Sequence, residues 1–176
     1  MGDERTGSAA MTHPKHVLFI CTGNTCRSPM AEGLFRKATV DRRDFTVSSA
    51  GTSASNGAPA SRETQAILRK RGASLVGFKS RPVTAALLES ATHVFAMTQG
   101  HLASLEARFP DHSDKFFLVR EFAGPPSARM VMDVPDPIGM GAAAYEEVAK
   151  VFDAAIPSIL AYLDAPGTQK AKSKNL

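Results

Sequence analysis

Residues 16–32 read HVLFICTGNTCRSPMAE, and this stretch decides the fold. The run 16–20 is continuously apolar and has the length of a strand that is covered on both faces of a sheet. Ser28-Pro29 then precedes an amphipathic segment, which predicts that Ser28 caps a helix and that Pro29 takes its first position. The chain thus passes from a buried strand into a helix through residues 21–28, which hold both cysteines of the sequence.

The same alternation continues outward along the chain. Further strands are predicted at 45–49, 93–97 and 116–119, and further helices at 60–71, 100–108 and 142–163. Strands that alternate with helices form βαβ units, so we predict an α/β fold: one domain in three layers, with a central parallel sheet of four strands flanked by helices. Ligands of such sheets bind beyond the carboxyl ends of the strands, where the loop after residue 20 lies.

Composition and the chain ends limit the class of protein. The 176 residues are 43% hydrophobic and 22% charged, as expected for a soluble globular domain. Residues 1–14 lack the apolar core of a signal peptide and are predicted to be a disordered leader, in which Met11 is an alternative start to Met1. Residues 165–176 are predicted to be a lysine-rich disordered tail, which leaves 15–164 as the domain. No apolar run approaches the ~20 residues of a membrane span, so we expect a cytoplasmic location.

The net charge of +4 does not indicate a nucleic-acid partner. The tail carries three lysines and the leader a net charge of −1, which leaves +2 on the domain. Nucleic-acid binding uses a clustered basic face interleaved with aromatic residues, and the sequence has no tryptophan and only two tyrosines. We therefore expect neither a nucleic-acid nor a membrane partner. The sequence leaves the oligomeric state open, a monomer included.

The residue types between the first strand and the first helix are those of an anion site. A loop that enters a helix N-terminus offers several unpaired backbone N–H groups and the positive end of the helix dipole. Gly23 and Asn24 tolerate positive φ, which lets successive amides turn inward. Arg27 adds a planar guanidinium that matches two phosphate oxygens. The loop is therefore predicted to hold a phosphate dianion.

Cys21 lies at the base of this loop. The inward dipoles favour its thiolate at neutral pH, and Ser28 can donate a hydrogen bond to the sulfur. A thiolate beneath a bound phosphoryl group is positioned for in-line attack, which gives a phosphocysteine intermediate. A cysteine at a strand end can also be a small buried apolar residue. The frame of a cysteine, five residues, an arginine and a serine favours the nucleophile.

The leaving group of such a reaction needs a proton. The stretch MDVPDPIG, residues 132–139, offers Asp136, and the proline after it keeps the loop stiff and extended. The carboxylic acid could protonate the leaving atom, and the carboxylate could then activate the water that hydrolyses the intermediate. Asp133 is the competing candidate. Asp136 could also be no more than a turn residue.

Cys26 has two interpretations. It could be a packing residue, or it could form a reversible disulfide that protects the cysteine five residues earlier. A zinc site of His13, His16, Cys21 and Cys26 would have the right ligand types, but the strand between the two pairs separates them by ~17 Å. We therefore expect no metal and no cofactor. Three further histidines are expected at the surface or at strand ends rather than in catalysis: His93, His101 and His112.

The motifs C-T-G-N-T-C-R-S, S-A-G-T (49–52) and D-P-I-G together resemble the low-molecular-weight protein-tyrosine-phosphatase family, and most of all its bacterial protein-arginine-phosphatase branch. The resemblance covers residues 17–163. It implies a four-stranded parallel sheet and hydrolysis of phosphorylated protein side chains through phosphocysteine, without metal. By position it implies that Cys21 is the nucleophile, Arg27 the phosphate binder and Asp136 the general acid.

The resemblance also assigns supporting roles. Asn24 and Ser28 would organise the loop, and Ser49 would buttress Asn24. Phe78 departs from the pattern, because many members have a histidine of the supporting network there, so we expect a different bracing of the loop. The substrate phosphoryl group would be held by the whole loop: Thr22, Gly23, Asn24, Thr25, Cys26, Arg27 and Ser28.

Two positions bear on the substrate. Members that act on phosphotyrosine usually have a bulky aliphatic residue at the position of Thr25 and aromatic residues along the pocket wall. Here the wall position after Asp136-Pro137 is Ile138, which offers no ring face for stacking. These features slightly favour phosphoarginine over phosphotyrosine, although Thr25 could also do no more than satisfy a turn amide.

Two other function classes are less consistent with the sequence. Arsenate reductases share this fold and loop, but their chemistry relays a disulfide through cysteines outside the loop, and this sequence has none. A non-catalytic phosphate-binding module would be expected to lack the nucleophile or the acid, and both are present.

Overall fold

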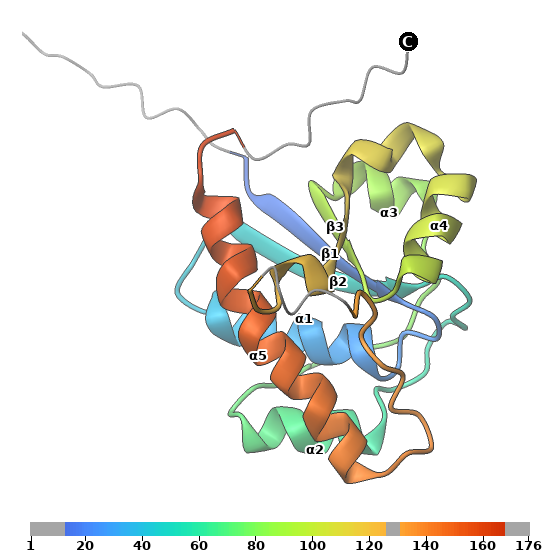
Figure 1. The fold of residues 1–176 in the computed structure, drawn as a ribbon, viewed down its shortest axis with the longest axis vertical. Coiled ribbons are helices and arrows are strands. Elements are labelled where there is room, and N and C mark those ends of the chain that lie inside the picture. The colour runs from blue at the N-terminus through green and yellow to red at the C-terminus, as the bar shows by residue number, and fades with distance from the viewer. Residues whose placement is uncertain (1–12, 126–130, 168–176) are drawn as a thin grey trace, which may run out of the picture.

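Four parallel strands form the centre of the molecule, in the order β2-β1-β3-β4 (Figure 1). The computed structural model describes residues 13–125 and 131–167. The strands are β1 (Lys15–Cys21), β2 (Phe45–Gly51), β3 (His93–Ala96) and β4 (Phe116–Leu118). The predicted α/β fold with a four-stranded parallel sheet is confirmed.

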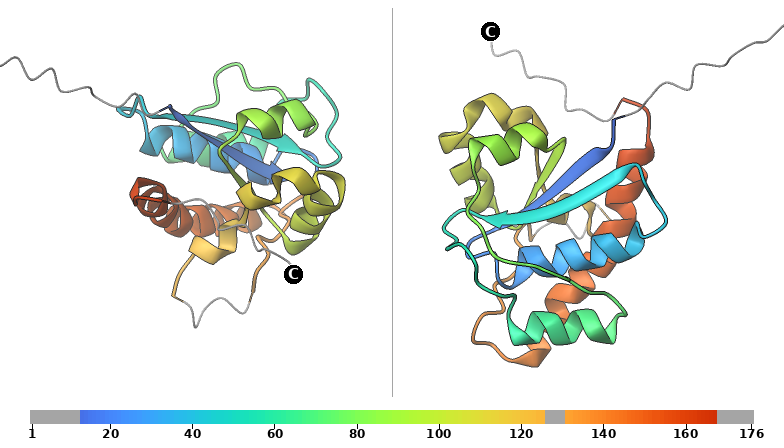
Figure 2. Two further views of the ribbon diagram at one scale, coloured as in Figure 1. Left: turned by 90° about the horizontal axis from the view of Figure 1, so that it is seen from above. Right: turned by 180° about the vertical axis from the view of Figure 1, so that it is seen from behind.

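Helices cover both faces of this sheet (Figure 2). One face is covered by α1 (Arg27–Ala38) and α5 (Ala142–Asp164), on which α2 (Arg62–Lys70) packs, and the other face by α3 (Ala85–Ser90) and α4 (Gln99–Arg108). Two 3-10 helices flank β4: η1 (Pro110–Lys115) and η2 (Val119–Phe122). The two faces form two separate parts of the core.

The apolar run of β1 follows from its central place. Val17 and Phe19 belong to the core on the α1 and α5 side, and Leu18 and Ile20 to the core on the α3 and α4 side. All four side chains are 0% exposed. A strand that is covered on both faces has no polar face to alternate with, which is why its sequence is continuously apolar.

The strand order reverses at β1. The chain leaves β1 through α1 to pair β2 on one edge, and later returns to pair β3 on the other edge. In open sheets of this kind, ligands bind at the carboxyl ends of the strands on either side of such a reversal, which here are β1 and β3.

The start of α1 differs from the prediction. The helix begins at Arg27, and its cap residue Cys26 makes no side-chain capping bond. Pro29 is thus the third helical residue, which is tolerated because first-turn amides have no partner inside a helix. The hydroxyl of Ser28 does not cap the helix, since its oxygen is turned toward the interior of the loop. Three short elements, α3, η1 and η2, were not predicted.

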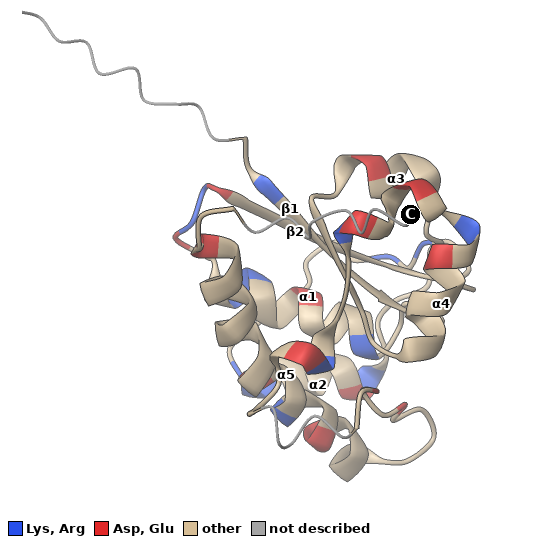
Figure 3. Ribbon diagram, turned by 45° about the horizontal axis from the view of Figure 1, so that its top comes forward, with Lys and Arg blue, Asp and Glu red and all other residues tan. Residues whose placement is uncertain are grey.

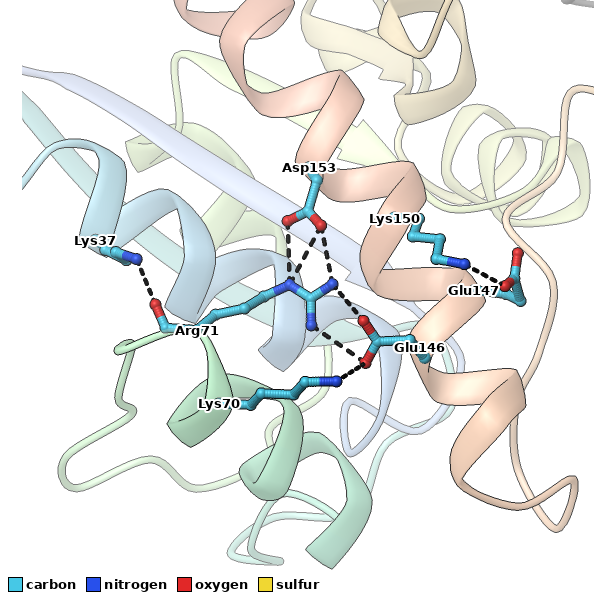
Figure 4. A network of polar contacts seen from close by, with 7 residues as sticks. All are labelled: Lys37, Lys70, Arg71, Glu146, Glu147, Lys150 and Asp153. Atoms are coloured by element: carbon cyan, nitrogen blue, oxygen red, sulfur yellow. Dashed lines mark hydrogen bonds and ion pairs between the residues drawn. The ribbon is translucent and has the colours of Figure 1, made fainter.

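A charged network joins α2 to α5 (Figure 4). Arg71, directly after α2, lies 2.8 Å from Glu146 and 2.9 Å from Asp153 of α5, and its side chain is only 17% exposed. Lys70 adds a longer contact to Glu146 at 3.6 Å. Because Arg71 is held by two carboxylates at once, the network fixes the first half of α5 against α2.

The surface carries both signs of charge. Figure 3 shows acidic and basic residues interspersed along the same helices. Within the described residues, no helix is long and apolar enough to cross a membrane. The predicted leader and tail lie almost entirely outside the described residues.

Candidate active site

The loop between β1 and α1 is fastened on one side to the end of β2. The amides of Thr52 and Ser53 donate to the carbonyl oxygens of Cys21 and Thr22, over 2.9 and 3.0 Å. This approach requires a glycine at 51, because a Cβ on Gly51 would lie 2.2 Å from the Thr22 carbonyl oxygen. The S-A-G-T stretch thus lets the end of β2 contact the loop backbone directly.

The other side of the loop is fastened to the start of α2. The Ser61 amide donates to the Thr25 carbonyl oxygen over 2.8 Å, and the Thr64 hydroxyl donates to the Cys26 carbonyl oxygen over 3.0 Å. With these carbonyl groups held outward, the peptide N–H groups turn inward. Across 13–125 and 131–167, none of the amides of residues 22–27 donates a hydrogen bond. Unpaired amides at the N-terminus of a helix are suited to bind an oxyanion.

The turn of the loop depends on Asn24 rather than on Gly23. Of the two residues that tolerate positive φ, Asn24 adopts it, with φ of 57°, and Gly23 does not. The Asn24 side chain explains why this strained conformation persists. Its amide nitrogen donates to Ser28 Oγ and Ser49 Oγ over 2.8 and 2.9 Å, and its oxygen accepts from the Arg81 amide over 3.0 Å.

These contacts explain how Asn24 is held although position 78 is a phenylalanine and not the histidine of many family members. The Asn24 side chain offers two N–H groups and one oxygen, and each has a partner. The backbone amide of Arg81 supplies the donor to the oxygen, so the bracing of Asn24 does not use the side chain at position 78.

A chain of hydrogen bonds leads from a buried carboxylate to the sulfur of Cys21. Ser49 donates to Glu32 over 2.6 Å and therefore accepts from Asn24. Asn24 also donates to Ser28, whose own proton is then free for Cys21 Sγ, 2.9 Å away. The Asn24 amide thus donates in two directions: through Ser49 toward the Glu32 carboxylate, and through Ser28 toward the sulfur of Cys21.

Glu32 was not found from the sequence. It lies in the second turn of α1, is 4% exposed, and contacts Arg36 over 2.6 Å. Burial raises the pKa of Glu32, while the hydrogen bond from Ser49 and the charge of Arg36 lower it. The available signal was its position: Glu32 follows Ser28 by four residues, which places a charged residue on the helix face that the loop occupies.

Arg27 joins the phosphate loop to the loop of Asp136. Its side chain is 6% exposed, and it donates from Nη1 to the Val134 carbonyl oxygen over 3.1 Å. Its Nη2 lies 3.7 Å from Asp136 Oδ2, and the Asp136 side chain is 51% exposed. The predicted nucleophile, phosphate binder and acid are thus brought to one site by segments more than 100 residues apart.

Asp133, the competing acid candidate, has another contact. Its Oδ1 accepts a hydrogen bond from the Gln99 amide over 2.7 Å, at the start of α4. Beside it, the Val134 amide donates to the Met97 carbonyl oxygen over 2.8 Å. Asp133 therefore fastens the acid loop to the start of α4. Asp136 instead accepts the Ile138 amide at Oδ1 over 3.2 Å and turns Oδ2 toward Arg27.

Cys26 packs against α5. It is 7% exposed, and its Sγ lies 3.2 Å from the hydroxyl of Tyr145. Burial, with the neighbouring sulfur, raises the pKa of Tyr145 to about 12, so the phenol stays protonated and can donate to Cys26. Both Cys21 and Cys26 are free thiols in the structure.

The histidines differ in part from expectation. His93 begins β3, and His112 is half-buried in η1. His101 was expected at the surface or at a strand end, but it is 7% exposed, lies in the first turn of α4, and contacts Thr22 of the loop over 2.7 Å. Thr98 caps α4 by accepting from the His101 amide over 3.1 Å, which places His101 in the first turn of the helix.

The described residues also bear on the alternative zinc site. Among them, no three His, Cys, Asp or Glu side chains are grouped so that they could hold a metal ion. His16 instead contacts Ser48 Oγ over 2.6 Å. What the site does assemble is a sulfur, an oxyanion cradle, a guanidinium and a carboxyl group, which is the set needed to transfer a phosphoryl group to sulfur and then to water.

Comparison with known proteins gives a consistent result. Residues 16–169 match the family described as low molecular weight phosphotyrosine protein phosphatase. A protein-arginine-phosphatase of Geobacillus stearothermophilus is 34% identical over 140 residues, which are 80% of this chain and 93% of that protein. A low molecular weight protein-tyrosine-phosphatase of Streptomyces coelicolor is 35% identical over 151 residues, 82% of this chain and 91% of that one. The crystal structure of a low molecular weight protein tyrosine phosphatase from T. tengcongensis has a TM-score of 0.76 at 36% identity, and covers 84% of this chain and 98% of that chain.

Proposed function

The chain belongs to the low molecular weight phosphotyrosine protein phosphatase family, whose members are cysteine-based phosphatases. From this premise we propose that it acts on phosphorylated protein side chains, with phosphoarginine preferred over phosphotyrosine. Cys21 is the nucleophile, Arg27 holds the phosphoryl oxygens, and Asp136 is the general acid and base. The convergence of these three side chains on the inward amides of the loop carries the proposal.

The reaction has two displacements at phosphorus. The Cys21 thiolate attacks the phosphoryl group, a P–S bond forms, and the P–N bond of phosphoarginine or the P–O bond of phosphotyrosine breaks. Asp136 gives its proton to the departing nitrogen or oxygen. The Asp136 carboxylate then takes a proton from water, whose oxygen attacks phosphorus and releases phosphate and the Cys21 thiolate. The loop amides and Arg27 stabilise the charge on the phosphoryl oxygens in both steps.

The substrate preference rests on two side chains at the mouth of the site. Thr25 is half-buried in the middle of the loop and leaves more room than a bulky aliphatic residue. Ile138, two residues after Asp136, is 63% exposed and presents no ring on which a phenol could stack. A planar guanidinium needs no such ring, and its N–H groups could donate to the Asp136 carboxyl group instead. The family includes proteins named for either substrate, so a direct comparison is needed.

Thr25→Ile should shift the preference toward phosphotyrosine. The larger side chain narrows the space beside the phosphorus and removes a hydroxyl, so kcat/KM for a phosphoarginine peptide should fall, while kcat/KM for the matched phosphotyrosine peptide should hold or rise. We expect the ratio of the two constants to change by about ten-fold or more. Thr25→Ser, which keeps the hydroxyl, is the control and should stay near the parent ratio. A ratio that does not move toward phosphotyrosine in Thr25→Ile would remove Thr25 as the filter.

We further propose that Cys26 protects the nucleophile from oxidation. Mild peroxide would convert the Cys21 thiolate to a sulfenic acid, and attack by the Cys26 sulfur would form a disulfide and release water. Dithiothreitol should then restore full activity. In Cys26→Ser the same exposure should cause a largely irreversible loss, because the sulfenic acid has no partner and is oxidised further. Full recovery of Cys26→Ser after prolonged exposure would contradict protection.

A further inference from the structure

His101 is a buried histidine that has no part in the chemistry described so far. It contacts two hydroxyl groups, with Nδ1 3.0 Å from Thr98 Oγ1 and Nε2 2.7 Å from Thr22 Oγ1. A neutral imidazole has one donor and one acceptor nitrogen, and a hydroxyl can fill either role, so both contacts are satisfied in either tautomer. Burial and the nearby Arg27 lower the pKa of His101 to about 4, which keeps the ring neutral where the enzyme would work.

Thr22 is the loop residue directly after Cys21, and it is held from two sides. Its carbonyl oxygen accepts from the Ser53 amide at the end of β2, and its hydroxyl contacts His101 at the start of α4. β2 and β3 are the two neighbours of β1, so these two contacts hold Thr22 from both sides of β1. The side chain is otherwise exposed. Without the contact to His101, the peptides before and after Thr22 would be held by the bonds from the Thr52 and Ser53 amides alone, both of which come from the end of β2.

The part of the chain that holds Thr22 also holds the acid loop. The segment 97–101 accepts the Val134 amide at the Met97 carbonyl oxygen, and it donates the Gln99 amide to Asp133. His101 lies in the same segment. The loop that carries Cys21 and the loop that carries Asp136 are therefore both fastened to residues 97–101.

We propose that His101 is a positioning residue that fixes the phosphate loop to residues 97–101 through Thr22, and so keeps the oxyanion cradle pre-organised beside the acid loop. It touches neither the phosphoryl group nor the sulfur. Its effect comes from limiting the conformations of Thr22 before the oxyanion binds, since a site that is already ordered does not lose that freedom on binding. The proposal deepens the proposed phosphatase function and rests on the loop being its phosphate site.

The test compares Thr22→Val and His101→Asn with the unchanged protein, and inorganic phosphate is the probe. Thr22→Val replaces the hydroxyl by a methyl at an exposed position, and His101→Asn keeps a polar group near Thr98 but does not reach Thr22. The dissociation constant for phosphate, followed by NMR titration, should rise about five-fold in each, the loss expected for one hydrogen bond. The double variant should be no weaker than either single variant, because both remove the same contact.

Two controls separate positioning from folding and from chemistry. His101→Gln extends an amide toward Thr22 and should recover most of the phosphate affinity. Within each variant, kcat/KM should fall by one factor, whether the aryl phosphate has a good or a poor leaving group. Damage to the general acid Asp136 would instead lower kcat/KM mainly for substrates with poor leaving groups. Phosphate binding needs no turnover, so the result is independent of which phosphorylated side chain is the substrate. An unchanged affinity in Thr22→Val, or losses that multiply in the double variant, would overturn the proposal.

Discussion

Cys21→Ser should reduce turnover of every phosphorylated substrate by at least about a thousand-fold. Serine is close to cysteine in size, and it can keep the contact to Ser28, but its hydroxyl does not ionise at neutral pH. A hydrogen bond from Ser28 to the side chain at position 21 does not change this, because an alcohol is far less acidic than a thiol. The measurement is kcat for an aryl phosphate and for a phosphoarginine peptide, at saturating concentration.

The same variant tests whether the loop survives the change. Inorganic phosphate should bind Cys21→Ser about as well as the parent protein, because the amides of 22–27 and the Arg27 guanidinium are retained. Loss of activity with intact phosphate binding would assign the defect to the nucleophile. Turnover above about a thousandth of the parent rate would contradict a mechanism that passes through the Cys21 sulfur.

Asp136→Asn should have an effect that depends on the leaving group. An amide cannot give up a proton, so departure of a strongly basic oxygen or nitrogen should slow by about a hundred-fold or more. A good leaving group such as 4-nitrophenolate departs without protonation, and its release in the first step should slow far less. The measurement is the pre-steady-state burst of a series of aryl phosphates, plotted against the pKa of the leaving phenol.

Asp133→Asn is the matched control for this acid assignment. An asparagine keeps an oxygen that can accept the Gln99 amide, so the acid loop should stay fastened to the start of α4. We expect a small effect that is equal for all leaving groups. If Asp133→Asn steepens the dependence on the leaving group and Asp136→Asn does not, the acid has been assigned to the wrong residue.

Much of the fold could be predicted because its signals are local. The apolar run of β1 reports burial on both faces, and α2 lies within the predicted range 60–71, followed by Gly72 with φ of 66°. The start of α1 was misplaced because the pair Ser28-Pro29 usually marks a capped helix. Here the Ser28 hydroxyl is used by Asn24 and Cys21, so the N-terminal amides stay uncapped toward the anion site. The six-residue helix α3 is too short to show a periodic pattern.

The residues of the candidate site are likewise of two kinds, those with a local signal in the sequence and those without one. Cys21, Arg27 and Asp136 were predicted because their residue types and spacing carry the chemistry. Glu32 and His101 were not, because each acts through a partner that the sequence does not place beside it: Ser49 for Glu32 and Thr22 for His101. The two members of the Glu32–Ser49 pair are 17 positions apart in the sequence, and those of the Thr22–His101 pair are 79 positions apart. Such contacts depend on how the strands pair, and no local pattern encodes that pairing.

The central claim, that the phosphoryl group is transferred to Cys21, is tested most directly by trapping the intermediate. Asp136→Asn should hydrolyse the phosphoenzyme slowly, because the carboxylate that activates water is missing. The variant would be mixed with an aryl phosphate that has a good leaving group, quenched rapidly, digested, and examined by mass spectrometry. The account predicts that one phosphoryl group is found on the peptide that contains Cys21, and that it disappears as phosphate is released. A phosphoryl group on another residue, or full release of the phenol with no phosphoenzyme at any time, would contradict it.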